Sequence, residues 1–159
     1  MQPEVIDEVR RVFDLLRGVL SDTFSFDALA NFTALYRKKP LRIEEAVLPV
    51  AITGYCIALR DVDLICTRQG LDAILVVTVR LHEIAHLLLG HIPFRSDATT
   101  LSYATFVPHR DLSSSQYRVQ TFAYDLPAEC AAETLATLLL KCIFREQATL
   151  PSLARKVYG

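Results

Sequence analysis

Residues 81–91 read Leu-His-Glu-Ile-Ala-His-Leu-Leu-Leu-Gly-His, and the rest of the chain is interpreted around this stretch. His82 and His86 are four residues apart, so on an α-helix both side chains lie on one face, about one turn apart, and can bind one zinc ion. Glu83 adjoins them, and a carboxylate there can take a proton from a water molecule that the metal activates. The stretch therefore predicts a hydrolytic zinc site on a helix.

The H-E-x-x-H pattern alone is weak evidence, because it fixes three positions and occurs by chance in many proteins. Its surroundings strengthen the interpretation. The residues between Ile74 and Leu89 are mostly aliphatic, which is typical of a helix buried on most of its circumference. Two histidines and a glutamate on such a helix would each be costly to bury unpaired, whereas a metal with a bound water satisfies all three.

Length and composition are those of one compact domain, residues 1–159. A chain of 159 residues with 52% hydrophobic content and a mean hydropathy of +0.28 can bury a full core. The formal net charge is -1, from 17 basic and 18 acidic residues. No overall field therefore favours direct binding of nucleic acid or of an anionic membrane.

The cysteines indicate a reducing compartment. Cys56, Cys66, Cys130 and Cys142 lack C-x-x-C spacing, and no signal peptide is visible, so we expect a cytoplasmic protein with reduced thiols. Cys130 and Cys142 are expected to be buried as small hydrophobic residues, although Cys130 is also a lesser ligand candidate because it adjoins Glu129. No apolar run reaches the roughly 18 residues of a membrane span.

Two helices are predicted before the motif. Apolar residues recur at helical spacing over residues 3–20, and Ser25 or Asp27 can begin a second helix. The basic run at residues 37–39 is predicted to be a solvated helix end, with binding of an acidic partner as the alternative.

A small sheet is predicted between these helices and the motif. Residues 41–47, 52–59 and 62–67 are short segments rich in β-branched side chains, and the last two read as a hairpin. We expect a mostly helical α+β domain with a three-stranded antiparallel sheet preceding the motif helix. An edge of that sheet could hold an extended peptide by main-chain pairing.

The motif helix is predicted over residues 71–89, with Gly90 as the residue that ends it. His91 lies five residues beyond His86 and off the face that carries the two histidines. A structural or supporting role is favoured for His91 over direct metal binding.

Residues 92–127 form the least regular part, and a connection this long is usually functional or partly helical. It could cover or border the metal cleft. Four side chains in it could donate a hydrogen bond to a developing oxyanion, with ordinary surface or packing roles as the alternative: Tyr103, His109, Tyr117 and Tyr124.

A last aliphatic helix is predicted over residues 127–140, and it carries Glu129 and Glu133 on one face. A site that keeps one metal position for water needs a third protein ligand, which Glu129 supplies, while Glu133 hydrogen-bonds a ligand histidine. Capping of the helix is the alternative for Glu129.

These two blocks resemble the ImmA/IrrE family of metallopeptidases, zincins whose third ligand is a glutamate. Residues 82–91 are similar to the family's HE-hydrophobic-small-H-LLLGH, and residues 129–136, Glu-Cys-Ala-Ala-Glu-Thr-Leu-Ala, are similar to its E-x-x-A-(N/D/E)-x-(F/L)-A pattern. The order of the predicted elements also agrees. Two positions depart from the pattern: Leu140-Lys141 replaces the frequent Met-Pro or Leu-Pro, and Glu133 stands where Asn or Asp is usual.

The resemblance implies a zincin-like fold and a cytoplasmic zinc endopeptidase that cleaves a helix-turn-helix repressor encoded nearby. His82, His86 and Glu129 would be the metal ligands and Glu83 the general base. Two alternatives stay open. One is the toxin component of a toxin–antitoxin pair, and the other is a non-proteolytic module that only binds a regulator.

Overall fold

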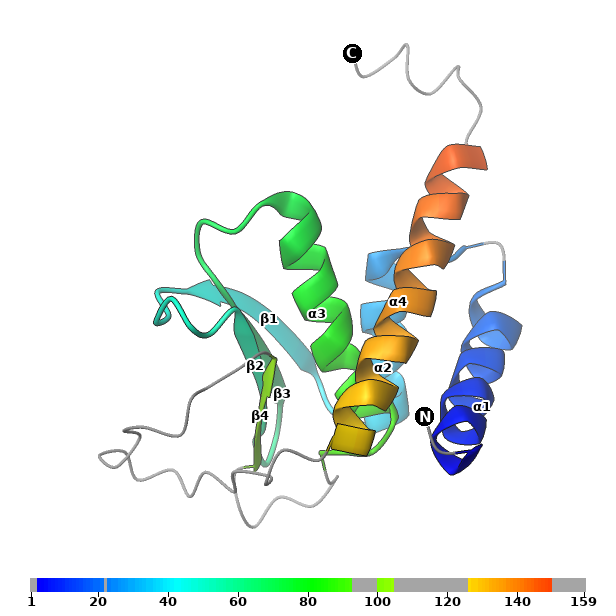
Figure 1. Cartoon of the computed structure of the whole chain (residues 1–159), viewed down its shortest axis with the longest axis horizontal. Coiled ribbons are helices and arrows are strands. Elements are labelled where there is room, and N and C mark those ends of the chain that lie inside the picture. The colour runs from blue at the N-terminus through cyan, green and yellow to red at the C-terminus, as the bar shows by residue number, and fades with distance from the viewer. Residues whose placement is uncertain (1–2, 22, 93–99, 105–125, 150–159) are drawn as a thin grey trace.

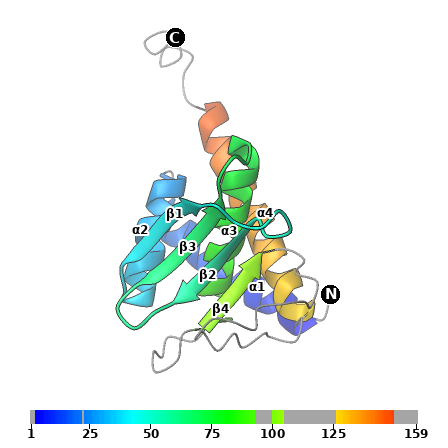
Figure 2. The same ribbon diagram turned by 90° about the vertical axis from the view of Figure 1, so that its left-hand side faces the viewer.

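The computed structural model describes residues 3–21, 23–92, 100–104 and 126–149 of the chain. In chain order these form α1 (Pro3–Leu20), α2 (Phe26–Arg37), β1 (Leu41–Ala46), β2 (Gly54–Ala58), β3 (Asp63–Arg68), α3 (Ala73–Leu88), β4 (Thr100–Ala104) and α4 (Leu126–Thr149). Figure 1 shows the helices gathered to one side of the sheet, and Figure 2 shows them behind it. The predicted α+β class is confirmed.

The sheet differs from the predicted antiparallel arrangement of three strands. Three strands precede α3, as expected, and β2 and β3 pair in antiparallel fashion. However, the strand order is β1-β3-β2-β4, and β1 runs parallel to β3, with Leu41 opposite Asp63. A fourth strand, β4, follows α3 and pairs antiparallel with β2. The connection of residues 47–53 carries the chain past the place that β3 later fills, so β1 pairs with β3 rather than with β2.

The first two helices form where the periodicity predicts them. In α1 the buried side chains recur at intervals of three and four residues and form one apolar stripe: Val5, Val9, Val12, Leu16 and Leu20. Helix α2 begins after Ser25, whose hydroxyl accepts a hydrogen bond from the Ala28 backbone N–H at 3.1 Å. That bond satisfies one of the donors that a helix start leaves unpaired.

The prediction of a solvated basic run at residues 37–39 is wrong for Arg37. Its side chain is buried, and Nε and Nη2 lie 2.7 and 3.1 Å from the two carboxylate oxygens of Asp63, itself buried at the start of β3. Nη1 donates to the backbone carbonyl of Ile92 at 2.7 Å. Lys39 is also largely buried, and its Nζ donates to the Leu59 carbonyl oxygen at 3.0 Å. Only Lys38 of the three remains exposed, and it ends α2 in the left-handed conformation, with φ 55°. Arg37 therefore joins α2, β3 and the chain beyond α3.

Helix α3 lies at the centre of the fold. It begins after Asp72, whose carboxylate accepts from the Leu75 N–H at 2.9 Å, and it ends at Leu88, with Leu89 as the cap residue and Gly90 beyond it at φ +74°. Every residue from Leu81 to Leu89 is buried, whereas Ile74 in the first turn is 63% exposed. The predicted burial therefore holds for the second half of the helix, which is the half that carries the histidines.

Helix α4 continues to Thr149, beyond the predicted end near residue 140. It packs against both α3 and α1, and its buried apolar residues join theirs in one hydrophobic cluster. This packing brings the N-terminal turns of α4 over the second half of α3.

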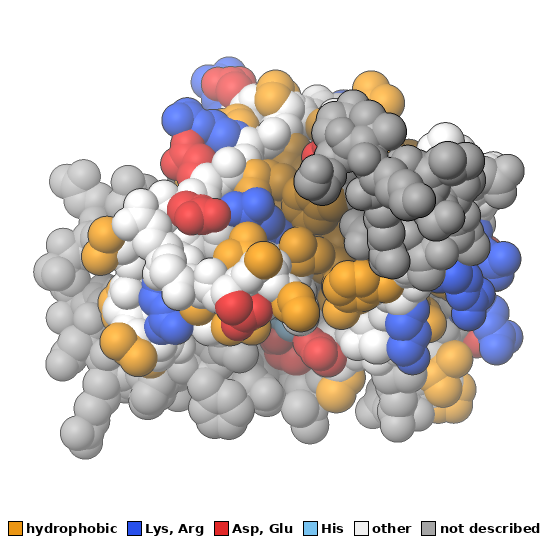
Figure 3. Space-filling view, turned by 90° about the horizontal axis from the view of Figure 1, so that it is seen from above, with side chains coloured by type: hydrophobic (Ala, Val, Ile, Leu, Met, Phe, Trp, Pro, Cys, Tyr) orange, Lys and Arg blue, Asp and Glu red, His pale blue; other side chains and the backbone are white. Residues whose placement is uncertain are grey.

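The described surface carries mixed charge. Figure 3 shows acidic, basic and hydrophobic side chains interspersed over the face seen from above, in keeping with a net charge of -1. Within the described ranges, none of the helices has the length and apolar character needed to cross a bilayer.

We expect Gly54→Ala to destabilise the fold, because α3 approaches the sheet closely at this residue. An added Cβ would lie 2.5 Å from Val79 Cγ1 and 2.8 Å from the Cys66 carbonyl oxygen, and that oxygen belongs to the backbone of β3. The expected loss in free energy of unfolding is about 1–3 kcal/mol, measured by urea denaturation.

The matched control is Gly18→Ala in α1, where an added Cβ meets no atom within 4 Å. It should stabilise the protein by about 0.5–1 kcal/mol, because alanine favours the helix over glycine. Equal stabilities of the two variants would contradict the close approach at Gly54.

Candidate metal centre

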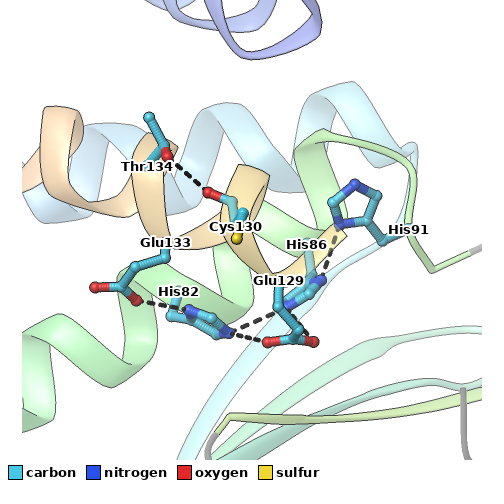
Figure 4. A network of polar contacts seen from close by, with 7 residues as sticks. All are labelled: His82, His86, His91, Glu129, Cys130, Glu133 and Thr134. Carbon is cyan, nitrogen blue, oxygen red and sulfur yellow. Dashed lines mark hydrogen bonds and ion pairs between the residues drawn. The ribbon is translucent and has the colours of Figure 1, made fainter. Parts of the chain in front are cut away.

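Helices α3 and α4 bring three potential metal ligands together. The Nε2 atoms of His82 and His86 lie 3.0 Å apart on one face of α3. Glu129, in the first turn of α4, places one carboxylate oxygen 3.3 Å from His82 Nε2 and the other 3.4 Å from His86 Nε2. Figure 4 shows the three side chains converging from the two helices. One ligand atom from each lies within 4.8 Å of the others, so the group could hold a metal ion.

These distances are close to those between the ligands of a metal ion. With bonds of about 2.0–2.1 Å to zinc, donor atoms at the corners of a tetrahedron are about 3.3 Å apart. The two histidine Nε2 atoms are 3.0 Å apart, and each lies 3.3 or 3.4 Å from a different oxygen of Glu129. Two imidazoles and one carboxylate also form a donor set that hydrolytic zinc sites use. Other divalent transition metals accept the same donors, so the group could hold a metal ion, but the geometry does not select the metal.

The charges around the group also suit a cation. Burial lowers the pKa of His86, and the nearby His82 lowers it further, against the opposing effect of Glu129, so His86 favours the neutral form that binds metals. Burial disfavours the charge on Glu129, but hydrogen bonds and charge interactions with both histidines lower its pKa to about 2. The carboxylate is therefore ionised at neutral pH.

His82 behaves differently from His86. Burial lowers its pKa, but the hydrogen bond that His82 donates to Glu129 and the negative charges of Glu83, Glu129 and Glu133 outweigh burial and raise the pKa above its ordinary value. His82 therefore holds a proton more firmly than His86 does, and a metal ion would take the place of that proton.

The outer ring nitrogen of each histidine also has a partner. His82 Nδ1 lies 3.3 Å from Glu133 Oε2, and His86 Nδ1 lies 3.0 Å from His91 Nδ1. Such contacts fix the orientation of a ligand ring and the nitrogen that carries its proton. The side chain of Glu133 is 65% exposed, so solvent reaches the His82 side of the group.

Glu83 lies beside these ligands and is fully buried. Its negative charge raises the pKa of His82 on its own helix and contributes, after burial, to the raised pKa of Cys56 on β2. The charge of this buried carboxylate therefore acts on both His82 and Cys56. Cys56, with a pKa well above its ordinary value, stays a neutral thiol.

The remaining sequence candidates have different outcomes. Cys130 is exposed rather than buried and does not belong to the metal-ligand group, while Cys142 is partly buried. The backbone of Tyr103 pairs with that of Tyr55 in the sheet. The Tyr103 side chain and three further oxyanion candidates lie outside the described residues: His109, Tyr117 and Tyr124.

The sequence favoured a structural or supporting role for His91 without naming its partner, which is His86. His91 is off the helix face, as predicted, but the chain turns back at Gly90, and the His91 backbone N–H bonds to the His86 carbonyl oxygen at 3.1 Å. A glycine four residues after a histidine, followed by a second histidine, was the signal that could have revealed it.

Comparisons of this chain with protein-family models, with curated proteins and with solved structures found no match. The resemblance to the ImmA/IrrE family therefore remains a prediction from its two motif blocks.

We expect Glu129→Gln to lose zinc far more readily than Glu133→Gln. Both variants replace a carboxylate by an amide one helical turn apart on α4, but only Glu129 contacts both histidine Nε2 atoms. Glu133→Gln keeps an oxygen that can accept from His82 but removes the negative charge, and it should weaken zinc binding by about 10–100-fold, as is typical for groups that orient a ligand. Zinc content after dialysis against a graded chelator series measures both, with His86→Ala as the reference for a destroyed site. The reverse order would exchange the roles of the two glutamates.

Proposed function

We propose that this protein is a zinc-dependent endopeptidase that cuts a helix-turn-helix repressor and so relieves repression. The observation that carries the proposal is the convergence of His82, His86 and Glu129 beside a buried Glu83 on the same helix. A site that served only to hold a metal would not need a carboxylate at position 83. A hydrolytic site needs one, to move protons.

In the proposed reaction, the zinc ion would be held by His82, His86 and Glu129. When bound, zinc supplies Lewis acidity, which acidifies a water molecule and polarises a peptide carbonyl. Glu83 takes the proton of the attacking water and passes it to the leaving amine. Glu133 keeps the His82 ring oriented through its contact with Nδ1 of that ring.

A protein substrate is supported by the sheet. In the described part of the chain, β1 and β4 form the two edges, and β4 also contacts α3, which carries the histidines. An extended peptide can add to such an edge through main-chain hydrogen bonds. The mixed surface charge gives no comparable support for direct binding of nucleic acid.

The repressor, the zincin-like assignment and the cytoplasmic location rest on the motif resemblance to the ImmA/IrrE family. A toxin component of a toxin–antitoxin pair would use the same metal group, and so would a module that only binds a regulator. In the proposal the partner protein is cut, whereas a module that only binds a regulator would leave it intact.

We expect the zinc-loaded protein to convert the helix-turn-helix protein encoded beside it into a discrete fragment. Glu83→Gln should keep its zinc and lose about 10²–10⁴-fold in cleavage rate, because an amide cannot act as a general base. The measurements are fragment formation by mass spectrometry and zinc content of the same samples.

Glu4→Gln is the matched control for this experiment, since Glu4 is exposed in the first turn of α1 and should leave the rate unchanged. A neighbour that binds tightly but stays intact would support the regulator-binding module instead. Cleavage that is as fast with Glu83→Gln as with the wild type would remove Glu83 from the reaction.

A further inference from the structure

We propose that His91 is a positioning residue of the metal centre: it accepts a hydrogen bond from Nδ1–H of His86, and the buried Arg37–Asp63 pair holds it in place. The inference deepens the proposed function, because it rests on the metal site, but it does not depend on peptidase activity.

The direction of the hydrogen bond follows from the role of His86. Its Nδ1 lies 3.0 Å from Nδ1 of His91, and two ring nitrogens at that distance share one proton. The rings meet at 65°, so they contact through these nitrogens rather than by stacking their faces. A neutral imidazole that offers its Nε2 lone pair to a metal carries its proton on Nδ1. His86 is therefore the donor, and His91 accepts through Nδ1.

The end of α3 places His91 for this contact. Gly90 adopts a positive φ of 74°, and the His91 N–H bonds to the His86 carbonyl oxygen at 3.1 Å, across five residues. This is the Schellman form of helix ending, in which the second residue beyond the cap commonly packs an apolar side chain against the third residue from the end. Here those two positions hold His91 and His86. The helix end could therefore form with an apolar residue at position 91, so formation of the helix end does not explain the polar contact between His91 and His86.

The chain is held again directly after His91. Nη1 of Arg37 donates to the Ile92 carbonyl at 2.7 Å, while its other nitrogens bind Asp63. The exposed fractions of the Arg37 and Asp63 side chains are 0% and 1%, and Ile92 is also fully buried. His91 thus lies between two fixed points, the turn at Gly90 and the carbonyl of Ile92.

Stability alone does not account for this buried pair. Apolar residues of similar volume commonly stabilise a protein as well as a buried ion pair does, or better. What apolar residues cannot supply is the directed hydrogen bond to Ile92, which fixes the backbone beside His91. The pair therefore connects α2 and β3 to the orientation of the His86 ring.

The decisive comparison is between His91→Asn and His91→Leu. Asparagine places Oδ1 the same number of bonds from the backbone as histidine Nδ1, and it can accept the same proton. Leucine has nearly the shape of asparagine, suits the helix end, and has no acceptor. Melting of the metal-free proteins would check that both variants fold.

We expect the Kd for zinc, measured by competition with a chromophoric chelator, to rise about 10–100-fold in His91→Leu. In His91→Asn it should stay within roughly threefold of the wild type, because the acceptor is kept. Equal affinities of the two variants would overturn the proposal, whether both matched the wild type or both fell.

A second readout locates the proton itself. In ¹⁵N-edited spectra of the zinc-loaded protein, the ring proton of His86 should lie on Nδ1, and its protection from exchange should persist in His91→Asn and be lost in His91→Leu. A proton on Nε2 of His86 instead would overturn the proposal. Zinc binding in the expected order without any cleavage would support the positioning role while contradicting the peptidase.

The contribution of Arg37 is tested by a double-mutant cycle. Arg37→Met combined with Asp63→Leu removes both charges and the bond to Ile92, and it should weaken zinc binding in the wild-type background. In the His91→Leu background it should have no further effect, since it acts through His91. If the double variant weakened zinc binding by the same factor in both backgrounds, this part of the proposal would be overturned. Arg37→Lys, which keeps the charge but cannot bind Asp63 and Ile92 in the same forked geometry, gives a second test if the double variant does not fold.

Discussion

The burial of polar side chains on α3 is the constraint on which the rest of the structure depends. His82, Glu83 and His86 lie in a segment whose other residues from Leu81 to Leu89 are buried and aliphatic or alanine. A polar group in such a layer is costly unless it finds a partner. For the two histidines, the partners come from α4 on one side and from the turn after α3 on the other. The position of α4 is thus set by polar contacts as well as by apolar packing.

The same burial prepares the group for a cation. Two of the three ligands, His86 and Glu129, already favour their metal-binding protonation states at neutral pH, as the lowered pKa of each shows. His82, whose pKa is raised, holds its proton more firmly than His86 does. Few protons therefore need to leave these side chains when a metal binds. The ligands have this property even though they come from two distant parts of the chain. The environment that makes these groups expensive to bury also makes them effective ligands.

Local patterns predicted most of the helices and the pairing of ligands within each helix, because apolar periodicity and i, i+4 spacing act over a few residues. The contacts that were missed are long-range or depend on a turn. Nothing near Arg37 in the sequence indicates that Asp63, on another element, will bury it. The parallel pairing of β1 with β3 likewise depends on where a connection crosses the sheet. His91 was placed off the helix correctly, but its contact with His86 depends on the turn at Gly90.

The strand order has a consequence for how the chain assembles. β2 and β3 are joined by a short turn, and a hairpin of this kind closes in about 1–10 μs. Both outer strands then add to an existing template: β1 to β3 on one side, and β4 to β2 on the other. Although β1 is made first, its partner β3 comes last among the three strands before α3. Because non-local pairing is slower than hairpin closure, we expect β1 to pair with β3 only after the hairpin has formed. The sheet would then grow outward from its centre rather than in the order of synthesis.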